Sequence, residues 1–260
     1  MRKLALAVLL IATTVGVAQY GLRSPAFVGG VLRPASAGVD PDLEGWWKLN
    51  DGSGTSAADA TGNGNTGTIT GNPTWGTGPN SNGDLVFDGT GDLVTIANEA
   101  NFDFETNTLF SITFWLKVNS SASGVDLLYS KNSAIGNLPG YTVQADPDNQ
   151  QVKAALVDIV GAAATTSSGI NSVVLNTWYF IAVTYDGSST GAGLKIYVNA
   201  GTPATGSGSV GTSILNNADP VFGVKAGLGG DLWAELDDAR IYTKQLTSGE
   251  VSTLNSAGAQ

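Results

Sequence analysis

The chain has 260 residues, of which 42% are hydrophobic and only 13% are charged, so it is long enough to bury a sizeable core in one large or two small domains. It contains no Cys and no His, which excludes disulfides, cysteine and histidine catalysis, zinc fingers, haem and iron–sulfur ligation. The net charge is −10, and it becomes −14 without residues 1–37, because four of the 12 basic residues and none of the 22 acidic residues lie there. A domain this acidic repels nucleic acid and anionic membranes and attracts cations such as calcium.

The first forty residues are typical of an export signal followed by a leader. A short cationic start precedes an apolar run over residues 4–18, which is shorter than the ~20 residues of a membrane span. Residues 1–18 are therefore predicted to be a signal peptide, with cleavage after residue 18 or as late as residue 37, where an Ala-Ser-Ala triplet ends. An uncleaved membrane anchor is the alternative. Either interpretation places the rest of the chain outside the cytoplasm, secreted or at the cell surface, with residues 19–41 as a leader or linker.

From Asp40 onward, short β-like runs alternate with turns rich in Gly, Asn and Ser. The clearest run is residues 110–118, in which one face is apolar and the other carries Ser, Thr, Trp and Lys. Residues 85–88 and 93–96 flank a Gly-Thr-Gly-Asp turn and are predicted to form a hairpin. Further strands are predicted at residues 126–131, 141–145, 151–157, 178–185, 194–198, 221–225 and 232–242.

Helical periodicity occurs only near the C-terminus, where residues 248–255 are predicted to form a short helix. Expected long loops at 59–84 and 158–175, together with unequal strand spacing, favour two stacked sheets over a closed barrel. The chain shows no internal repeat and no domain-splitting linker. It is therefore predicted to be all-β, with one domain that forms a sandwich or jelly roll of two antiparallel sheets.

Three stretches occur in a distinctive order: residues 47–54 with the loop 59–65, residues 85–92 with the strand end 114–117, and residues 177–187 with the closing stretch 236–250. The most distinctive motifs are Asp-Ala-Thr-Gly-Asn-Gly-Asn at 59–65 and Leu-Asp-Asp-Ala-Arg-Ile-Tyr at 236–242. In this order they resemble the laminin-G-like jelly roll of the concanavalin A-like lectin/glucanase superfamily. The order and spacing across residues 42–256 are specific for the fold and not for any one activity. The resemblance implies that residues 42–256 form one domain, a two-sheet antiparallel jelly-roll sandwich.

The resemblance implies a structural calcium ion where the two ends of the domain meet. Calcium takes about six to eight oxygen ligands, and the 59–65 loop offers a carboxylate, two amides and glycines that can turn carbonyls inward. By the resemblance, Asp237 of the closing strand supplies the partner carboxylate. The predicted ligands are Asp59, Asn63 and Asp237, with Asn65 and Asp238 as secondary choices. An ordinary tight turn has the same composition as this loop, and the adjacent Asp237 and Asp238 should point to opposite faces of a strand.

Catalysis is not expected. Glucanases of the same superfamily use carboxylates spaced along one strand as Glu-x-Asp-x-(x)-Glu, in which one of the residues between Asp and the second Glu is optional. Glu235 and Asp237 match the first two positions, but Ala239 and Arg240 stand where the second Glu would be, and arginine is neither an acid nor a base near neutral pH. With His also missing, a glycoside hydrolase or lyase is the disfavoured alternative.

An exported jelly roll without chemistry is expected to bind or to assemble. Sugar rings stack on aromatic side chains, and Trp115 has polar neighbours on its strand. The candidate ligand-binding residues are Trp115, Tyr185, Tyr197 and Trp233. Trp46, Trp47 and Trp178 are expected in the core instead.

The predicted function is therefore an exported, non-catalytic, calcium-stabilised domain that binds carbohydrate or a cell-surface glycan in adhesion. The alternative is a self-assembling surface or filament subunit, in which the arm at 19–41 adds a strand to the sheet edge of another copy. Nucleic acid is not an expected partner, and no stable membrane span is expected after processing.

Overall fold

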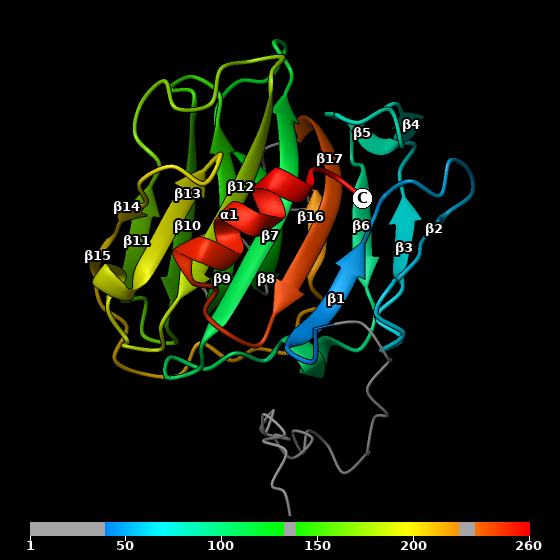
Figure 1. Cartoon of the computed structure of the whole chain (residues 1–260). Coiled ribbons are helices and arrows are strands. Elements are labelled where there is room, and N and C mark those ends of the chain that lie inside the picture. The colour runs from blue at the N-terminus through cyan, green and yellow to red at the C-terminus, as the bar shows by residue number, and fades with distance from the viewer. Residues whose placement is uncertain (1–39, 133–138, 224–231) are drawn as a thin grey trace, which may run out of the picture. The chain divides into compact units, whose positions relative to one another are not determined.

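The computed structural model describes residues 40–132, 139–223 and 232–260, and there the chain forms two antiparallel sheets stacked as a sandwich (Figure 1). The predicted all-β jelly-roll fold with one short C-terminal helix is confirmed. The signal peptide and most of the leader, residues 1–39, lie outside the described residues.

The sheet nearer the viewer in Figure 1, here called the front sheet, has eight strands. In spatial order they are β14 (Ala204–Thr205), β13 (Leu194–Val198), β12 (Trp178–Tyr185), β7 (Phe110–Val118), β17 (Trp233–Tyr242), β5 (Asp84–Asp88) and β4 (Thr74–Gly76), and β1 (Leu43–Trp47) pairs with the second half of β17.

The back sheet has nine strands. In spatial order they are β15 (Ser207–Gly208), β11 (Ala163–Ser167), β10 (Gln151–Val157), β9 (Gly140–Asp146), β8 (Asp126–Asn132), β16 (Val221–Gly223), β6 (Leu93–Ile96), β3 (Gly67–Thr70) and β2 (Ser56–Ala57). Two 3₁₀ turns, η1 (Glu99–Phe102) and η2 (Gly191–Gly193), connect strands.

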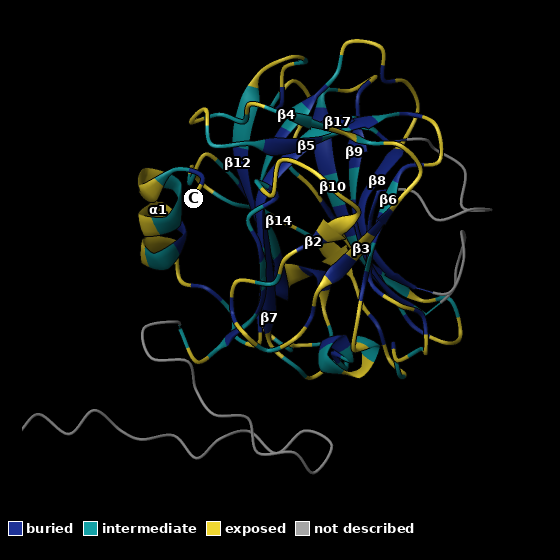
Figure 2. Ribbon diagram, turned by 90° about the vertical axis from the view of Figure 1, so that its right-hand side faces the viewer, coloured by how far each residue is buried: buried dark blue, intermediate teal, exposed yellow. Residues whose placement is uncertain are grey.

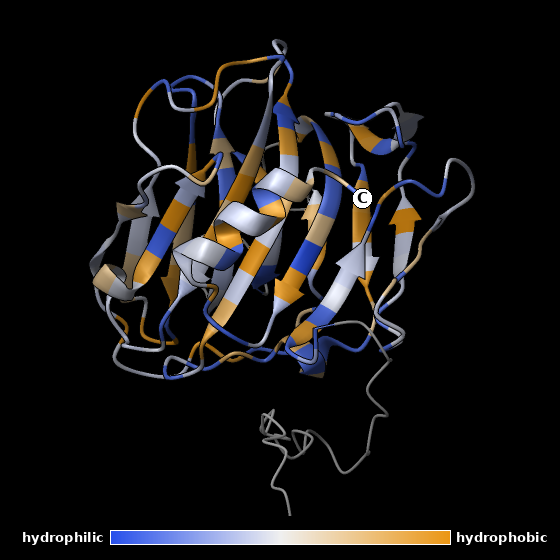
Figure 3. Ribbon diagram, in the orientation of Figure 1, coloured by the Kyte–Doolittle hydropathy of each residue, from blue (hydrophilic) through white to orange (hydrophobic). Residues whose placement is uncertain are grey.

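Period-two alternation builds the core between the sheets. In β7, Phe110, Ile112, Phe114 and Leu116 are at most 1% exposed and lie in the main core, because successive side chains of a strand point to opposite faces. Bands of hydrophobic and hydrophilic residues accordingly alternate along the front strands in Figure 3. The residues between them lie on the outer face, which is the face of the front sheet turned away from the back sheet.

A second hydrophobic cluster lies on that outer face, beneath helix α1 (Ser248–Ala257). Val251 of α1 packs there with residues such as Phe180 and Tyr242. The helix begins with a capping box, in which Thr247 and Glu250 bond each other's backbone N–H groups. Figure 2 shows α1 outside the sandwich, with its buried side toward the sheet.

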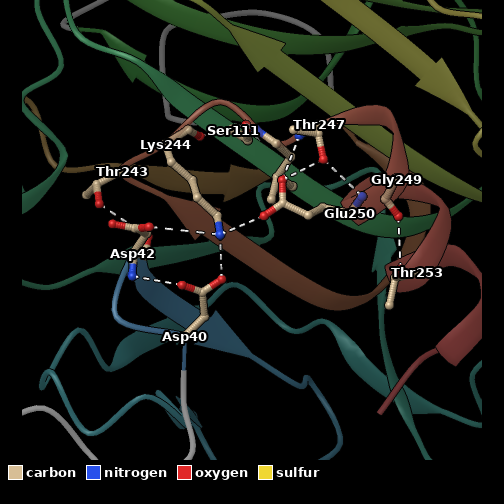
Figure 4. Close-up of polar contacts among 10 residues, drawn as sticks. Asp40, Asp42, Ser111, Thr243, Lys244, Thr247, Gly249, Glu250 and Thr253 are labelled. Carbon is tan, nitrogen blue, oxygen red and sulfur yellow. Dashed lines mark hydrogen bonds and ion pairs between the residues drawn. The ribbon is translucent and has the colours of Figure 1, made fainter. Parts of the chain in front are cut away.

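One lysine joins the start of the domain to this helix. The ammonium of Lys244 lies 2.7 Å from a carboxylate oxygen of Asp40, 2.9 Å from Glu250 and 3.9 Å from Asp42 (Figure 4). These ion pairs raise the pKa of Lys244 and, with the bonds of the capping box, lower the pKa of Glu250. The cluster thus fixes β1, β17 and α1 to one another.

Two local predictions are wrong. The Gly-Thr-Gly-Asp turn does not make a hairpin, because β5 pairs with β17 and β4 in the front sheet whereas β6 pairs with β16 and β3 in the back sheet. Residues 89–92 therefore carry the chain from the front sheet to the back sheet. The Asp92 carboxylate fixes this connection by accepting hydrogen bonds from the backbone N–H groups of Asp88 and Asn72. The expected long loops also contain short Thr-rich strands, β3 and β4 in the first and β11 in the second.

Candidate functional site

Asp237, in the closing strand β17, carries a buried carboxylate without a hydrogen-bond partner. The residue is 0% exposed, and neither carboxylate oxygen has a hydrogen-bond partner of normal geometry. It lies opposite Trp115 of β7 and therefore on the outer face of the front sheet. Burial, followed by the charge of Asp238, raises the pKa of Asp237 to about 8. The nearby backbone N–H of Asp238, which donates to the carbonyl of Lys48, lowers the pKa of Asp237 but does not offset the effect of burial.

Asp84, at the start of β5, is the second buried carboxylate of this region. It is 0% exposed, its Oδ1 atom accepts the N–H of Gly78 at 3.0 Å, and its Oδ2 atom has no partner. Burial and then the contact with Glu235 raise the pKa of Asp84 to about 6, while the charge of Asp84 in turn raises the pKa of Asp237. A bound cation would favour the ionised form of Asp237, which burial and the charge of Asp84 disfavour.

The loop at 77–83 covers the two carboxylates. Gly78 has φ +66°, and a Cβ atom there would lie 3.0 Å from Oδ2 of Asp237 and would clash with the carbonyl of Gly83, so only glycine fits. Asn82 adds a buried side-chain oxygen without a partner. The loop is tied to the end of the chain by Asn80, whose amide donates to the carbonyl of Ala259 at 2.9 Å. This loop therefore brings the backbone of Gly78 and Gly83 close to the Asp237 carboxylate.

The predicted ligand Asp59 lies in a different environment. Its Oδ1 atom accepts the N–H groups of Trp46 and Thr61 and the hydroxyl of Thr61, at 2.7–3.2 Å. Its Oδ2 atom accepts the N–H of Asn65 at 2.9 Å. Both oxygens are therefore used to hold the loop against β1.

The two predicted amide ligands also bond within the protein. Asn63 donates to the carbonyls of Leu43 and Glu44, at 3.2 and 2.9 Å. Asn65 is fully buried, donates to the carbonyl of Glu44 at 2.7 Å, and accepts from Asn101 at 2.7 Å. The 59–65 loop thus fits the ordinary-turn interpretation, because its polar groups fasten it to strand β1.

Asp238 has partners of its own. Arg240 forms two hydrogen bonds to its carboxylate at 3.0 and 2.8 Å, and the indole N–H of Trp46 donates to it at 2.6 Å. Burial nevertheless raises its pKa. The expected alternation of Asp237 and Asp238 fails because β17 bulges here: the register shifts between Asp237 and Arg240, and Asp238 has φ +50°.

The structure therefore divides the five predicted metal ligands among three places. Asp59, Asn63 and Asn65 share one loop, Asp238 pairs with Arg240, and Asp237 lies beside Asp84. Among the residues that the structure describes, no three acidic side chains are grouped to hold a metal ion. A cation at Asp237 and Asp84 would therefore need carbonyl and amide oxygens to complete its coordination.

Asp84 is not among the ligands predicted from the sequence. The signal was available, because Leu85 and Phe87 point into the core and the alternation places Asp84 on the same outer face as Asp237.

The four predicted ligand-binding aromatics lie in unlike places. Tyr185 is 0% exposed in the main core, where its hydroxyl donates to the carbonyl of Thr106, so it is not available to stack on a sugar. Tyr197 is 6% exposed in the cluster beneath α1. Trp115 is half-buried beside the same cluster, with an unpartnered indole N–H, and Trp233 packs on the edge of the main core.

The three tryptophans expected in the core also differ. Trp47 is fully buried in the core, and its indole donates to the carbonyl of Asn65. Trp46 is half-buried on the outer face, with the cations of Lys48 and Arg240 4.7 and 4.5 Å from its ring centre. Trp178 is also half-buried and lies on the outer face, opposite Lys117.

A sequence profile described as the concanavalin A-like lectin/glucanases superfamily matches residues 88–252, more than half of the chain. The chain belongs to this superfamily. The resemblance noted in the motifs is thereby confirmed, and the stacked sheets are those of its laminin-G-like members. Comparison with curated proteins finds no sequence match.

Several solved structures similar to this superfamily member are named as binding domains. The binding domain of Paraclostridial Mosquitocidal Protein 1 has a TM-score of 0.67 at 16% identity, covering 83% of this chain and 52% of that one. The receptor binding domain of botulinum neurotoxin D has a TM-score of 0.65 at 14% identity, with the same coverage. The botulinum neurotoxin serotype G binding domain has a TM-score of 0.59 at 17% identity, covering 83% and 51%. The chain spans about half the length of these structures, and at such identities the likeness shows the fold.

In the described parts of the chain, no helix has the length and apolar character needed to cross a membrane.

Proposed function

We propose that this protein is an exported, non-catalytic domain that binds carbohydrate at a cell surface and is stabilised by calcium. The observation that carries the calcium part is the Asp237 carboxylate, fully buried with two unpartnered oxygens. A buried charge without partners is costly, and a cation removes that cost.

The residues present fit calcium better beside Asp237 than at the 59–65 loop. Asp237 and Asp84 offer three oxygens without partners, and the covering loop brings the carbonyl of Gly83 close to them. Calcium accepts carboxylate, amide and carbonyl oxygens together. At Asp59, by contrast, both oxygens already accept N–H or O–H groups. We therefore assign the calcium to the outer-face carboxylates and leave the Asp59 loop a structural role.

The binding part is supported by the kind of proteins that share the fold. The similar structures are named as a binding domain and as receptor binding domains. The −10 net charge, which disfavours nucleic acid, is compatible with a neutral ligand such as a glycan.

A non-catalytic role is supported by the two residues that resemble a glucanase motif. Glu235 forms an ion pair with Lys117 at 2.6 Å, and Asp237 is covered by the 77–83 loop and fully buried. A substrate sugar would have to reach Asp237 through that loop, which makes this carboxylate unsuited to glycoside cleavage.

Self-assembly by strand addition has less support. The strands that end the two sheets are only two or three residues long: β14, β4, β15 and β2. The five-residue β1 pairs only with β17, and residues 59 and 60 bridge to its other side. These edges offer few backbone groups to an added strand.

Calcium and sugar binding can be tested on the same preparation. Isothermal titration with CaCl2 should show one site that is lost in Asp237→Asn, while Asp51→Asn, in an exposed loop, keeps it. A glycan array probed with the calcium-loaded protein should show binding. Absence of calcium binding would refute the metal assignment, and an empty array would refute the carbohydrate part.

A further inference from the structure

We propose that a row of side chains crossing the outer face of the front sheet binds a linear, neutral glycan, with Trp178 as its stacking platform. The inference rests on the proposed carbohydrate-binding function and deepens it, because it names the surface and the class of sugar.

The row follows from the strand register. Trp178 pairs with Lys117, Lys117 with Glu235, Glu235 with Val86, and Val86 with Thr74. Directly paired residues lie on the same face of a sheet, so the five side chains form one line across β12, β7, β17, β5 and β4. With strands about 4.8 Å apart, the line is about 19 Å long.

This row stays open while the row on one side of it is covered. Phe180 and Asp237, which lie two residues further along β12 and β17, are buried beneath α1 and the 77–83 loop respectively. Trp178, Val86 and the Lys117–Glu235 pair are each partly exposed, and Thr74 is exposed. A ligand can therefore reach the row without moving the helix or the loop.

Trp178 differs from the other tryptophans in its surroundings. All six tryptophans of the chain lie on strands of the front sheet. In the described residues, five of them belong to or pack against the two hydrophobic clusters, and Trp178 does neither. Its near neighbour is a cation, with the Lys117 ammonium 5.4 Å from the ring centre. A large aromatic ring that the hydrophobic clusters do not require, at an accessible face, is suited to stacking on the C–H face of a sugar ring.

The charges of the row indicate the class of sugar. Lys117 and Glu235 lie 2.6 Å apart, with 26% and 18% of their side chains exposed, so their charges compensate each other. Together they still offer donors and acceptors to hydroxyl groups. Because no uncompensated cation is present in the row and the chain is strongly acidic, a sulfated or uronic acid polymer is disfavoured.

The test is affinity electrophoresis and isothermal titration of the calcium-loaded full chain with neutral polysaccharides: mixed-linkage β-glucan, laminarin, xyloglucan and galactomannan. Heparin and alginate serve as acidic counterparts. Trp178→Ala should weaken neutral binding by about tenfold or more, which corresponds to about 1.4 kcal/mol, and Trp178→Phe should retain part of it. Trp46→Phe is the matched control, because Trp46 is also half-buried on the outer face beside cations.

Each outcome decides the inference. Loss in Trp178→Ala with retention in Trp46→Phe, at unchanged melting temperatures, supports it. If Trp178→Ala fails to fold, Lys117→Met should still weaken neutral binding, and an unchanged affinity overturns the inference. If Trp178→Ala still binds neutral polysaccharides, the assignment of the binding surface is wrong but the proposed function stands. If the chain prefers heparin or alginate, the assignment of a neutral sugar is wrong. No binding to any polysaccharide overturns both the inference and the proposed function.

Discussion

Asp59 and Asp237 are both acidic residues near the place where the first and last strands of the domain pair, but their carboxylates are used differently. The oxygens of Asp59 accept three N–H groups and one hydroxyl, whereas those of Asp237 accept none. Asp59 lies in a loop that closes on itself, and Asp237 lies on a strand where the neighbouring backbone groups already pair within the sheet. An acidic residue in a turn-rich motif thus tends to accept the backbone N–H groups of the turn. For an acidic residue on a covered sheet face, the nearby N–H groups are already paired, so it needs a partner from outside the sheet, such as a cation.

The largest effect is expected from Asp59→Ala. Removing the carboxylate leaves several loop N–H groups without their partner, so the free energy of unfolding should fall by about 3 kcal/mol. Urea unfolding should show this loss equally with calcium and with a chelator. Asp51→Ala, in the neighbouring exposed loop, should change stability little. A loss seen only with calcium would mean that Asp59 is a ligand after all.

The next effect is the stabilisation by calcium. At a free concentration 100 times the dissociation constant, calcium should add about 2.7 kcal/mol to the free energy of unfolding. Thermal unfolding should show this increase in the native chain and in Asp59→Asn, but not in Asp237→Asn. If Asp59→Asn loses the calcium effect, the two carboxylates do not differ in the way described above.

A smaller and opposite effect is expected without metal. Because burial raises the folded-state pKa of Asp237 to about 8, above the ordinary 3.8, the metal-free fold loses stability as the pH rises through that interval. Asp237→Asn removes the charge and keeps the shape, so at pH 8 with a chelator it should be more stable than the native chain by about 1–2 kcal/mol. Denaturation at pH 5 and pH 8 measures the difference. A variant that is less stable at both values would contradict an uncompensated charge.

The smallest effect concerns Asp158, a second carboxylate whose oxygens are fully used. It accepts the N–H groups of Val160, Ala162, Gly211 and Thr212, and these bonds lower its pKa to about 2. A depressed pKa contributes stability above the unfolded value of 3.8, and the contribution is lost as the pH falls toward 2. Asp158→Asn should therefore flatten the decline in melting temperature between pH 4 and pH 2. A decline as steep as that of the native chain would show that the hydrogen bonds of Asp158 do not contribute to stability in this pH range.

The sequence was sufficient for most of the fold because the central strands alternate clearly. The strands predicted at 151–157, 178–185 and 194–198 have these bounds in the structure. One apolar face of each strand points into the main core. The 85–96 hairpin was wrong because a turn motif reports a local reversal of the chain and not the sheet to which each arm belongs.

The candidate site was harder to predict because it depends on pairing between distant segments. Asp84 and Asp237 come together only because β5 pairs with β17. That their oxygens lack hydrogen-bond partners is known only when the position of the 77–83 loop is known. The bulge at Asp238 could not be predicted from the alternation of apolar and polar residues, because a bulge adds one residue and interrupts that alternation. Trp178 was assigned to the core from its residue type, although its partner across the strands is a lysine.

The Lys244 cluster has a mechanical consequence. Asp40 precedes and Lys244 follows the outermost pair of the first and last strands, Leu43 with Tyr242. A pulling force applied between the incoming chain and the closing helix would reach these ion pairs before any hydrogen bond of that ladder. The Lys244 ion pairs and the hydrogen bond from the Thr243 N–H to the Asp42 carbonyl are therefore the first contacts to bear a load when the two ends are pulled apart.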